Sequence, residues 1–352
     1  MSVKEVNVGV LGTGFVLDSS HLPVYNLLRD SVNVVAVAGT EEGKVESFRK
    51  KWGIRTGYHG PEAIERLCSN PEIDIVDVSL PNDLHLRAIS SAAENHKAVI
   101  CEKPLARNGE EAAKALGVVQ RYGVVHCYAE NQVFIPQVAK ARQVIREGVL
   151  GKITWIRSRE AHSGPHNAWF YDPDRAGGGV LLDMGCHSIE VARNLLQSKP
   201  ASVDAWTATL SHKIKTEDNS LVLVKYVNGA LSQCENSWTS KGGLDIRLEI
   251  FGTEGSIFID ITRETGMRVF SAVSGEKTGY VVEKADAKTG WMYPVPSEHY
   301  TYGYYDELSH FLQCIRTDTK PSETFEDGLL VNKIMDKAYR SSKNSAKWEM
   351  VE

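Results

Sequence analysis

The stretch "VNVGVLGTGF", Val6 to Phe15, sets the fold of the first part of this chain. Its first six residues are mostly apolar and rich in valine, which is typical of a buried strand. Gly12 permits a tight turn from this strand into a helix, and Gly14 lets a pyrophosphate approach the backbone at the helix N-terminus. Leu17 stands where a third glycine is usual, and that glycine serves helix packing rather than phosphate contact. The GxG pair is weak evidence by itself, so the prediction depends on what surrounds it.

The residues that follow repeat the strand pattern. Segments 31–40 ("SVNVVAVAGT"), 72–80 ("EIDIVDVSL") and 98–102 ("AVICE") are typical of buried strands. A helix that ends with Gly53 as its C-cap follows the first of them. Strands that alternate with helices at this spacing predict βαβ units and a parallel, doubly wound Rossmann sheet. Ligands of such sheets bind at the carboxyl ends of the strands.

These strand ends supply the candidate cofactor residues. The second strand ends at Gly39 and Thr40, where NAD-binding proteins usually carry an acid for the adenosine ribose and NADP-binding ones have an arginine nearby. Neither residue type stands there, so the sequence favours NAD and does not exclude NADP. We expect the dinucleotide to contact Gly12, Gly14, Phe15, Val16, Thr40, Pro81, Asn82, His85, Glu102 and Lys103.

Composition argues against several classes of protein. Among 352 residues, 40 Lys and Arg stand against 45 Asp and Glu, a formal net charge of −5, and no dense basic run suggests nucleic acid. No apolar run is long enough to cross a bilayer, and the N-terminus runs into a strand without a secretory core. The six cysteines are scattered and form no CxxC pair. We therefore expect a reduced, cytoplasmic enzyme without membrane contact.

Hairpin patterns follow in the second part of the chain. Residues 219–237 contain Asn228–Gly229 between two alternating apolar runs, which is the strongest short hairpin signal. Residues 244–260 repeat the design, with a turn between Gly252 and Gly255. These segments predict a large, mainly antiparallel open sheet with one covered face.

The expected fold class is therefore α/β, with two closely packed domains. Residues 1–127 form the dinucleotide-binding Rossmann domain, and residues 128–352 form an α+β substrate-binding domain. Two closing helices are expected within 301–316 and 325–343, and these helices are free to pack back on the first domain.

A polar helix is predicted in the segment Asn167–Leu196. Gly177, Gly178 and Gly179 precede it, and Asp183 and His187 lie four residues apart, so they share one helix face. Glu190 and Asn194 continue that face, and a solvated polar stripe is the simplest alternative. The three glycines favour a close approach by another backbone segment or by a ligand.

The loop "REAHSGPHNAWF", residues 159–170, precedes this helix. His162 and His166 are also four apart, but no acidic ligand set with recognisable spacing accompanies them, so we expect no metal site. Trp169 and the aromatic residues after it offer an apolar platform for a sugar ring, although a core cluster has the same pattern. We expect His162, His166 and Trp169 to border the substrate.

With these residues assembled, the chain resembles the Gfo/Idh/MocA family of NAD(P)-dependent sugar and polyol oxidoreductases. The resemblance runs along nearly the whole chain and rests on "PNDLH" (81–85), "EKP" (102–104) and "GGGVLLDMGCH" (177–187), together with the GxG. It implies that Lys103, Asp183 and His187 act on the substrate hydroxyl, and that a cis peptide precedes Pro104. The sequence departs from the family pattern at Leu17 and at Gly39–Thr40. These departures bear on the choice of cofactor rather than on the catalytic chemistry.

The chemistry suits these residue types. Oxidising a secondary alcohol removes a proton from oxygen and a hydride from carbon. A neutral His187 accepts the proton, Lys103 stabilises the negative charge that develops on the oxygen, and Asp183 orients the substrate or the catalytic pair. Nicotinamide takes the hydride.

Three functions stay open on the sequence. The first is a dehydrogenase acting on a sugar, a glycoside or an inositol. The second is glycoside cleavage through transient oxidation at sugar C3, elimination and re-reduction with a retained NAD. The third is a non-catalytic nucleotide-sensing regulator, which the complete Lys103, Asp183 and His187 set disfavours. A homodimer or homotetramer is the expected assembly.

Overall fold

A computed structural model describes residues 5–272, 283–284 and 289–351 of the chain. The chain divides into two compact units, which are described separately. Unit 1 comprises Met1–Asn131 and Tyr304–Asn332, and unit 2 comprises Gln132–Gly303 and Lys333–Glu352.

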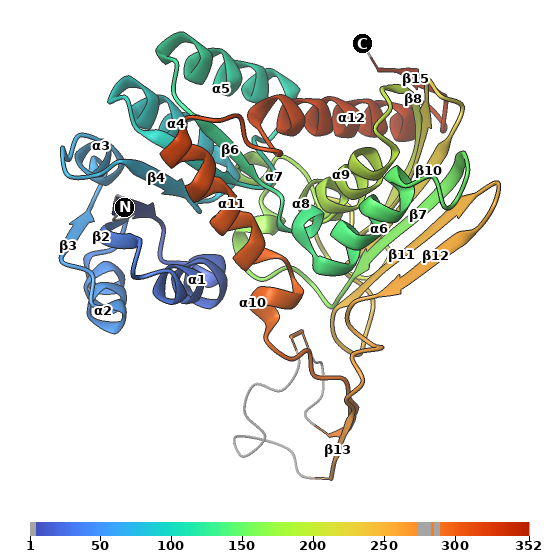
Figure 1. Cartoon of the computed structure of the whole chain (residues 1–352), viewed down its shortest axis with the longest axis horizontal. Helices are drawn as coiled ribbons and strands as arrows, with labels where there is room; N and C mark the ends of the chain where they lie inside the picture. The colour runs from blue at the N-terminus through green and yellow to red at the C-terminus, as the bar shows by residue number, and fades with distance from the viewer. Residues whose placement is uncertain (1–4, 273–282, 285–288, 352) are drawn as a thin grey trace. The chain divides into compact units, whose positions relative to one another are not determined.

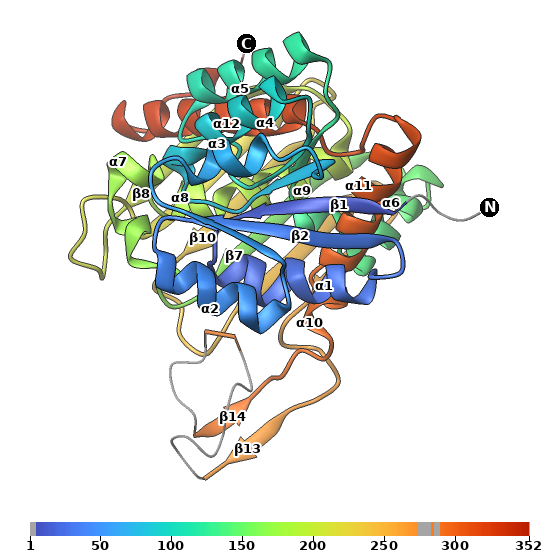
Figure 2. The same ribbon diagram turned by 90° about the vertical axis from the view of Figure 1, so that its left-hand side faces the viewer.

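Unit 1 is built on a six-stranded sheet in the order β3-β2-β1-β4-β5-β6, and every pair in it is parallel. This is the strand order of the Rossmann fold, so the predicted doubly wound sheet is confirmed. Figure 2 shows α1 and α2 on one face of the sheet and α3, α4 and α5 on the other. The elements are β1 (Val6–Leu11), η1 (Leu17–His21), α1 (Leu22–Leu27), β2 (Val32–Gly39), α2 (Glu42–Trp52), β3 (Thr56–His59), α3 (Ala63–Cys68), β4 (Ile75–Val78), η2 (Asn82–Leu84), α4 (His85–Glu94), β5 (Ala98–Glu102), α5 (Gly109–Tyr122) and β6 (His126–Ala129).

Unit 1 reaches beyond residue 127, where we placed the boundary, and also takes in a distant segment. Strand β6 contains Cys127 and pairs with β5, so the sheet continues past that residue. Helix α11 (Tyr304–Thr317) and the first turns of α12 (Phe325–Lys343) belong to the same unit. Phe325 is fully buried in the core that contains Leu105, because a large aromatic side chain gains most from leaving water. The closing helices thus extend a core laid down by the first 131 residues.

Unit 2 is built on a seven-stranded sheet in the order β12-β11-β7-β10-β9-β8-β15. Only β10 and β7 pair in parallel, so the expected mainly antiparallel sheet is confirmed. Helices α6, α8 and α9 lie along one face of it (Figure 1). The elements are η3 (Asn131–Phe134), α6 (Pro136–Arg146), β7 (Ile153–Ala161), η4 (Ala168–Tyr171), α7 (Pro173–Ala176), α8 (Val180–Asp183), α9 (Gly185–Leu196), β8 (Pro200–Ala208), β9 (Asn219–Tyr226), β10 (Leu231–Ser237), β11 (Asp245–Gly252), β12 (Ser256–Asp260), β13 (Val269–Ser271), β14 (Gly290–Met292), α10 (Glu298–Thr301) and β15 (Glu349–Met350).

Both predicted hairpins of unit 2 are confirmed. Strands β9 and β10 turn at Asn228–Gly229, where Gly229 has φ of 88° and Ala230 N–H donates to Asn228 Oδ1 at 3.0 Å. A positive φ at this position is what the Asn-Gly turn requires. Strands β11 and β12 form the second hairpin.

The single helix expected to carry both Asp183 and His187 is instead interrupted. Helix α8 ends at Asp183, Met184 has φ of −113°, and α9 begins at Gly185. The solvated stripe is also wrong, because Asp183 and His187 are each only 5% exposed and Glu190 is fully buried. These polar side chains lie inside unit 2, where a buried charge needs a partner.

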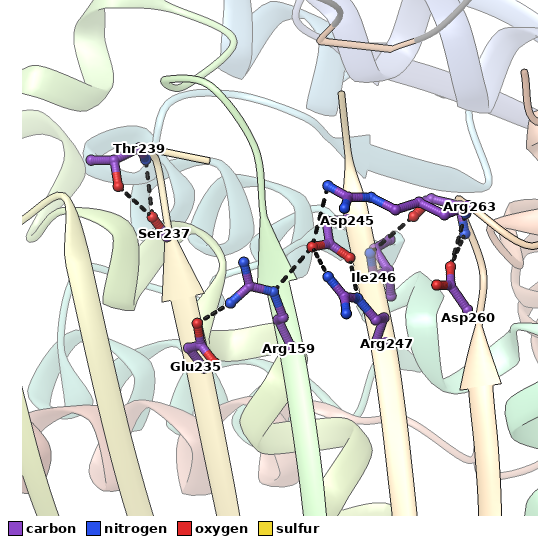
Figure 3. Close-up of polar contacts among 10 residues, drawn as sticks. Arg159, Glu235, Ser237, Thr239, Asp245, Ile246, Arg247, Asp260 and Arg263 are labelled. Atoms are coloured by element: carbon purple, nitrogen blue, oxygen red, sulfur yellow. Dashed lines mark hydrogen bonds and ion pairs between the residues drawn. The ribbon is translucent and has the colours of Figure 1, made fainter. Parts of the chain in front are cut away.

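The outer face of the unit 2 sheet carries a network of ion pairs around Asp245 (Figure 3). Its carboxylate accepts from Arg159 Nε at 3.1 Å and from Arg247 Nε and Nη2, each at 2.6 Å. Arg263 approaches at 3.4 Å, and Arg159 also pairs with Glu235. Burial alone raises the pKa of Asp245, but the hydrogen bonds from Arg247 and Arg159 outweigh it and hold the pKa below its ordinary value.

Two further expectations concern the cysteines and the membrane. All six cysteines are free and buried, which agrees with the reduced chain that we expected. Within the described residues, no helix has the length and apolar character needed to cross a membrane.

The Asp245 network yields a stability prediction. Asp245→Asn removes the charge that three arginines share, and we expect the free energy of unfolding to fall by about 1–3 kcal/mol, less than for a fully buried pair because the arginines are partly exposed. Glu249→Gln is the matched control, since it breaks the exposed pair with Arg157 on the same face and costs about 0–1 kcal/mol. Denaturant unfolding measures both variants.

The pH dependence of this effect has a defined sign. A carboxyl whose pKa is lowered on folding stabilises the protein above its unfolded pKa, about 3.9 for Asp, and loses that contribution as pH falls. The advantage of the wild type over Asp245→Asn should therefore shrink as pH drops below about 4. An equal advantage at every pH would contradict the role of the charge.

Candidate functional site

The turn after β1 lies at the point where the strand order of the Rossmann sheet reverses. Gly12 has φ of 117°, and a Cβ on it would lie 2.3 Å from the Ser79 carbonyl oxygen, at the end of the neighbouring β4. Only glycine fits there, as the sequence predicted. A Cβ on Gly14 would meet nothing within 4 Å, which leaves its backbone open to a ligand. The two glycines therefore form a cradle that suits the pyrophosphate of a dinucleotide.

The other predicted cofactor residues lie at the same edge of the sheet. Strands β1, β2, β4 and β5 are parallel, so their carboxyl ends lie at one edge of the sheet. Thr40 and Pro81 come shortly after β2 and β4, and Glu102 is the last residue of β5. Thr40 is exposed, as is Phe15 beside the turn. Val16 is partly exposed and is the N-cap of η1.

Asn82 and His85 are buried beneath this edge. The ring of His85 is fully buried, with Nε2 2.9 Å from the Leu80 carbonyl oxygen and Nδ1 3.1 Å from that of Pro104. Burial lowers the pKa of His85, although the backbone oxygens of Leu80, Leu105 and Pro104 oppose this. The ring joins the loops that follow β4 and β5 through backbone oxygens.

Lys103 follows the last residue of β5. The Lys103–Pro104 peptide is cis, as the resemblance implied. The Lys103 backbone N–H donates to Glu102 Oε2 at 3.0 Å, and Glu102 Oε1 lies 3.1 Å from His21 Nε2. The orientation of the lysine backbone therefore depends on a buried carboxylate.

In unit 2, Asp183 is held by an indole. Trp238 is fully buried and donates from Nε1 to Asp183 Oδ2 at 3.1 Å. Trp238 packs with Val180 and Met184, on either side of Asp183 in the chain. A buried carboxylate fixed in this way holds one orientation, which is a requirement for acting on a substrate.

The glycines before α8 allow a close approach by the chain itself. A Cβ on Gly179 would lie 2.1 Å from the Glu217 carbonyl oxygen, and one on Gly178 would lie 2.1 Å from the Tyr339 hydroxyl. The Glu217 carboxylate accepts from the backbone of Gly179 and Leu181 at 3.0 Å each, and from Tyr339 at 2.8 Å. The sequence predicted that the glycines admit either another backbone segment or a ligand. In the structure the backbone around Glu217 approaches them, and its contacts fix the start of α8.

The predicted substrate loop has a buried and an exposed part. His162 is 2% exposed, and its ring meets that of His166 edge to face at a centroid distance of 5.4 Å. His166 Nε2 lies 2.7 Å from Glu283 Oε1. Trp169 stacks on Phe170 at 3.8 Å, and Phe170 packs against the core around Trp238. Part of the aromatic run at residues 169–171 therefore packs in the hydrophobic core around Trp238.

Several residues of the site gave no sequence signal. Trp238 and Glu217 come from strand ends without a motif, and their roles appear only when the chain is folded. Lys284 Nζ donates to the Gly164 carbonyl at 2.8 Å; burial lowers its pKa, and the charge of Asp183 opposes this. Lys284 therefore lies within electrostatic reach of Asp183.

Comparison with known proteins gives the family. Residues 6–130 match the model of the oxidoreductase family with an NAD-binding Rossmann fold, and residues 138–258 match the GFO/IDH/MocA C-terminal domain. The chain belongs to the Gfo/Idh/MocA family. It is therefore an oxidoreductase whose unit 1 is an NAD-binding Rossmann domain.

Individual relatives of this family extend over nearly the whole chain. Levoglucosan dehydrogenase of Pseudarthrobacter phenanthrenivorans is 27% identical, covering 97% of this chain and 97% of its own. The scyllo-inositol 2-dehydrogenase (NAD(+)) of Bacillus subtilis is 28% identical, covering 93% and 91%. The structure of GenD2 from gentamicin A biosynthesis in complex with NAD has a TM-score of 0.91 at 25% identity, covering 100% and 98%.

The close approach at Gly179 gives a second prediction. Gly179→Ala places a methyl group against the Glu217 backbone, and we expect the free energy of unfolding to fall by about 1–3 kcal/mol. Gly117→Ala is the matched control, because a Cβ there meets nothing within 4 Å inside α5 and should stabilise by about 0.5–1 kcal/mol. Thermal and denaturant unfolding distinguish them, and a fully stable Gly179→Ala would show that this contact is not rigid.

Proposed function

We propose that the chain is an NAD-dependent dehydrogenase that oxidises a secondary hydroxyl of a sugar, a glycoside or an inositol. The observation that carries the proposal is the edge of the Rossmann sheet, where the Gly12–Gly14 cradle and the Glu102–Lys103 pair end parallel strands. Relatives named for levoglucosan and scyllo-inositol support a cyclic polyol as substrate class.

The residues present fit a dinucleotide. The open backbone at Gly14 receives the pyrophosphate, with Phe15 and Val16 at the start of the following helix and Thr40 toward the ribose. Pro81 and Asn82 follow β4, Glu102 ends β5 and Lys103 follows it, and these residues lie toward the nicotinamide end of the dinucleotide. His85, which is buried, acts by holding these loops. Bound NAD supplies the acceptor for the hydride.

The remaining chemistry falls to the protein. Lys103 donates hydrogen bonds to the substrate oxygen and stabilises the negative charge that develops there. His187 accepts the hydroxyl proton, because a neutral imidazole binds a proton near physiological pH. Asp183, fixed by Trp238, accepts a hydrogen bond from a neighbouring substrate hydroxyl and so orients the ring. His162, His166 and Trp169 border the substrate in unit 2.

The assembly and compartment are part of the same proposal. We infer a homodimer or homotetramer, with the exposed outer face of the unit 2 sheet as its interface. That face carries the exposed side chains of Trp206 on β8 and Phe258 on β12. The six free cysteines are consistent with a reducing, cytoplasmic location.

A panel of substrates tests the function. Sugars, glycosides and inositols are incubated with NAD and with NADP, and formation of the reduced cofactor is followed by its absorbance. We expect turnover of at least one cyclic polyol and preference for NAD, because the end of β2 has no arginine and Glu41 follows it. NADP binding tenfold tighter than NAD binding, measured by fluorescence titration, would contradict the cofactor preference.

Lys103→Ala tests the catalytic assignment. Losing an electrostatic contact to the reacting oxygen should lower kcat by about 10²-fold or more while NAD binding stays within a few-fold. Lys103→Arg should rescue poorly, since a planar guanidinium does not replace a compact ammonium. Lys114→Ala is the control, because that lysine is exposed on α5 and forms a solvent-exposed ion pair with Glu110 at 2.7 Å. A kcat for Lys103→Ala within about threefold of the wild type would refute the assignment.

A further inference from the structure

His21 lies buried between two carboxylates inside unit 1. Its ring Nδ1 is 2.7 Å from Asp77 Oδ2, and its Nε2 is 3.1 Å from Glu102 Oε1. The side chains of His21 and Asp77 are fully buried, and that of Glu102 is 9% exposed. No motif or sequence argument singled out this histidine.

The two contacts need a proton each, since an ionised carboxylate only accepts hydrogen bonds. Asp77 Oδ2 also accepts from the Tyr25 hydroxyl at 2.8 Å, and Glu102 Oε2 accepts from the Lys103 N–H at 3.0 Å. A doubly protonated ring satisfies both carboxylates at once. Burial alone lowers the pKa of His21, but Asp77 and Glu102 outweigh it and hold the pKa well above its ordinary value.

Burial favours the uncharged form of three other groups near the ring. Glu307 on α11 is fully buried, and burial together with the charge of Glu102 raises its pKa well above the ordinary value. Burial also raises the pKa of Tyr25 and of the Cys101 thiol. The ring of Tyr304 meets that of His21 at a centroid distance of 5.8 Å. The acidic groups in direct contact with the His21 ring are Asp77 on β4 and Glu102 on β5.

The position of His21 in the chain connects this bridge to the cofactor cradle. It ends η1, a π-helical turn in which the Leu22 N–H bonds to the Leu17 carbonyl, and η1 begins five residues after Gly12. Turns of this type are frequent at functional sites because they displace a side chain from its α-helical direction. One ring thus joins the segment after the dinucleotide turn to the strand end that carries Lys103.

We propose that His21 is a positioning residue for Lys103: through its bond to Glu102 it fixes the peptide from which the lysine side chain departs, and its bond to Asp77 on β4 holds the ring in place. The inference rests on the proposed function in one respect only, the assignment of Lys103 to the substrate oxygen. A displacement of a catalytic group by about 1 Å costs about 10²-fold in rate, so holding the lysine is a substantial contribution.

Two amide variants separate the two halves of the bridge. The amide of His21→Asn takes the place of Nδ1 and keeps the bond to Asp77, whereas the longer His21→Gln takes the place of Nε2 and keeps the bond to Glu102. We expect His21→Asn to lower kcat by about tenfold or more and His21→Gln by less than about threefold. The NAD dissociation constant should change little in both.

The control is His126→Asn, at a partly buried histidine of unit 1 that accepts from the Phe325 N–H at 3.2 Å. It should lower the melting temperature without changing kcat. A purely structural His21 predicts instead that kcat follows the melting temperature in all three variants, or that the Asn and Gln variants behave alike. Either result overturns the proposal.

A readout without turnover keeps the test independent of the proposed function. An amine-directed acylating reagent labels Lys103 at a rate that depends on the position and surroundings of its side chain. Mass spectrometry measures this rate relative to that of exposed Lys114. We expect His21→Asn to change this ratio by about threefold or more and His21→Gln to leave it unchanged. If the wild type turns over nothing in the panel, the proposed function fails while this ratio still decides the role of His21.

A further variant tests the proposal even if both His21 variants fail to fold. Glu102→Gln keeps an acceptor for the Lys103 N–H but removes the charge that the ring requires, and it should change the labelling ratio in the same direction as His21→Asn. An unchanged ratio would overturn the proposal.

Discussion

The parallel pairing of β1 with both β2 and β4 is the constraint on which unit 1 depends. The strand order reverses there, so the helices on either side diverge and the turns after β1 and β4 meet. The Gly12 contact with the Ser79 carbonyl is so close that a single methyl group would separate the two turns. Because every strand of this sheet runs the same way, the cradle and the Glu102–Lys103 pair also reach one edge.

Buried polar groups organise both candidate sites. In unit 1 the His21 ring, Asp77 and Glu102 satisfy one another, and in unit 2 Trp238 holds Asp183 while Glu217 holds the start of α8. Each group left unpaired in such a place would cost about 1–3 kcal/mol, so these contacts restrict the side chains to single orientations. The placement of the candidate catalytic groups thus depends on buried hydrogen-bond partners.

The sequence alone was most informative where local chemistry dictates structure. The strand runs, the Gly12 turn, the Gly53 cap and the Asn228–Gly229 hairpin all depend on residues near one another in the chain, and each was found as predicted. Predictions were wrong where contacts between distant segments determine the local structure. The helix predicted to carry both Asp183 and His187 is interrupted at Met184, and the burial of Asp183 and His187 excludes the alternative of a solvated stripe.

The sequence therefore determined the Rossmann sheet, because backbone turns and strand periodicity depend on short stretches of chain. Its motifs also carried the resemblance that indicated the family and the candidate catalytic residues. The tertiary structure alone decided that the glycines at 178 and 179 receive Tyr339 and Glu217, and that α11 completes unit 1. It also decided that His21 meets two carboxylates 56 and 81 residues away. A hydrogen bond between groups so far apart depends on the path of the whole chain, and no local pattern encodes that path.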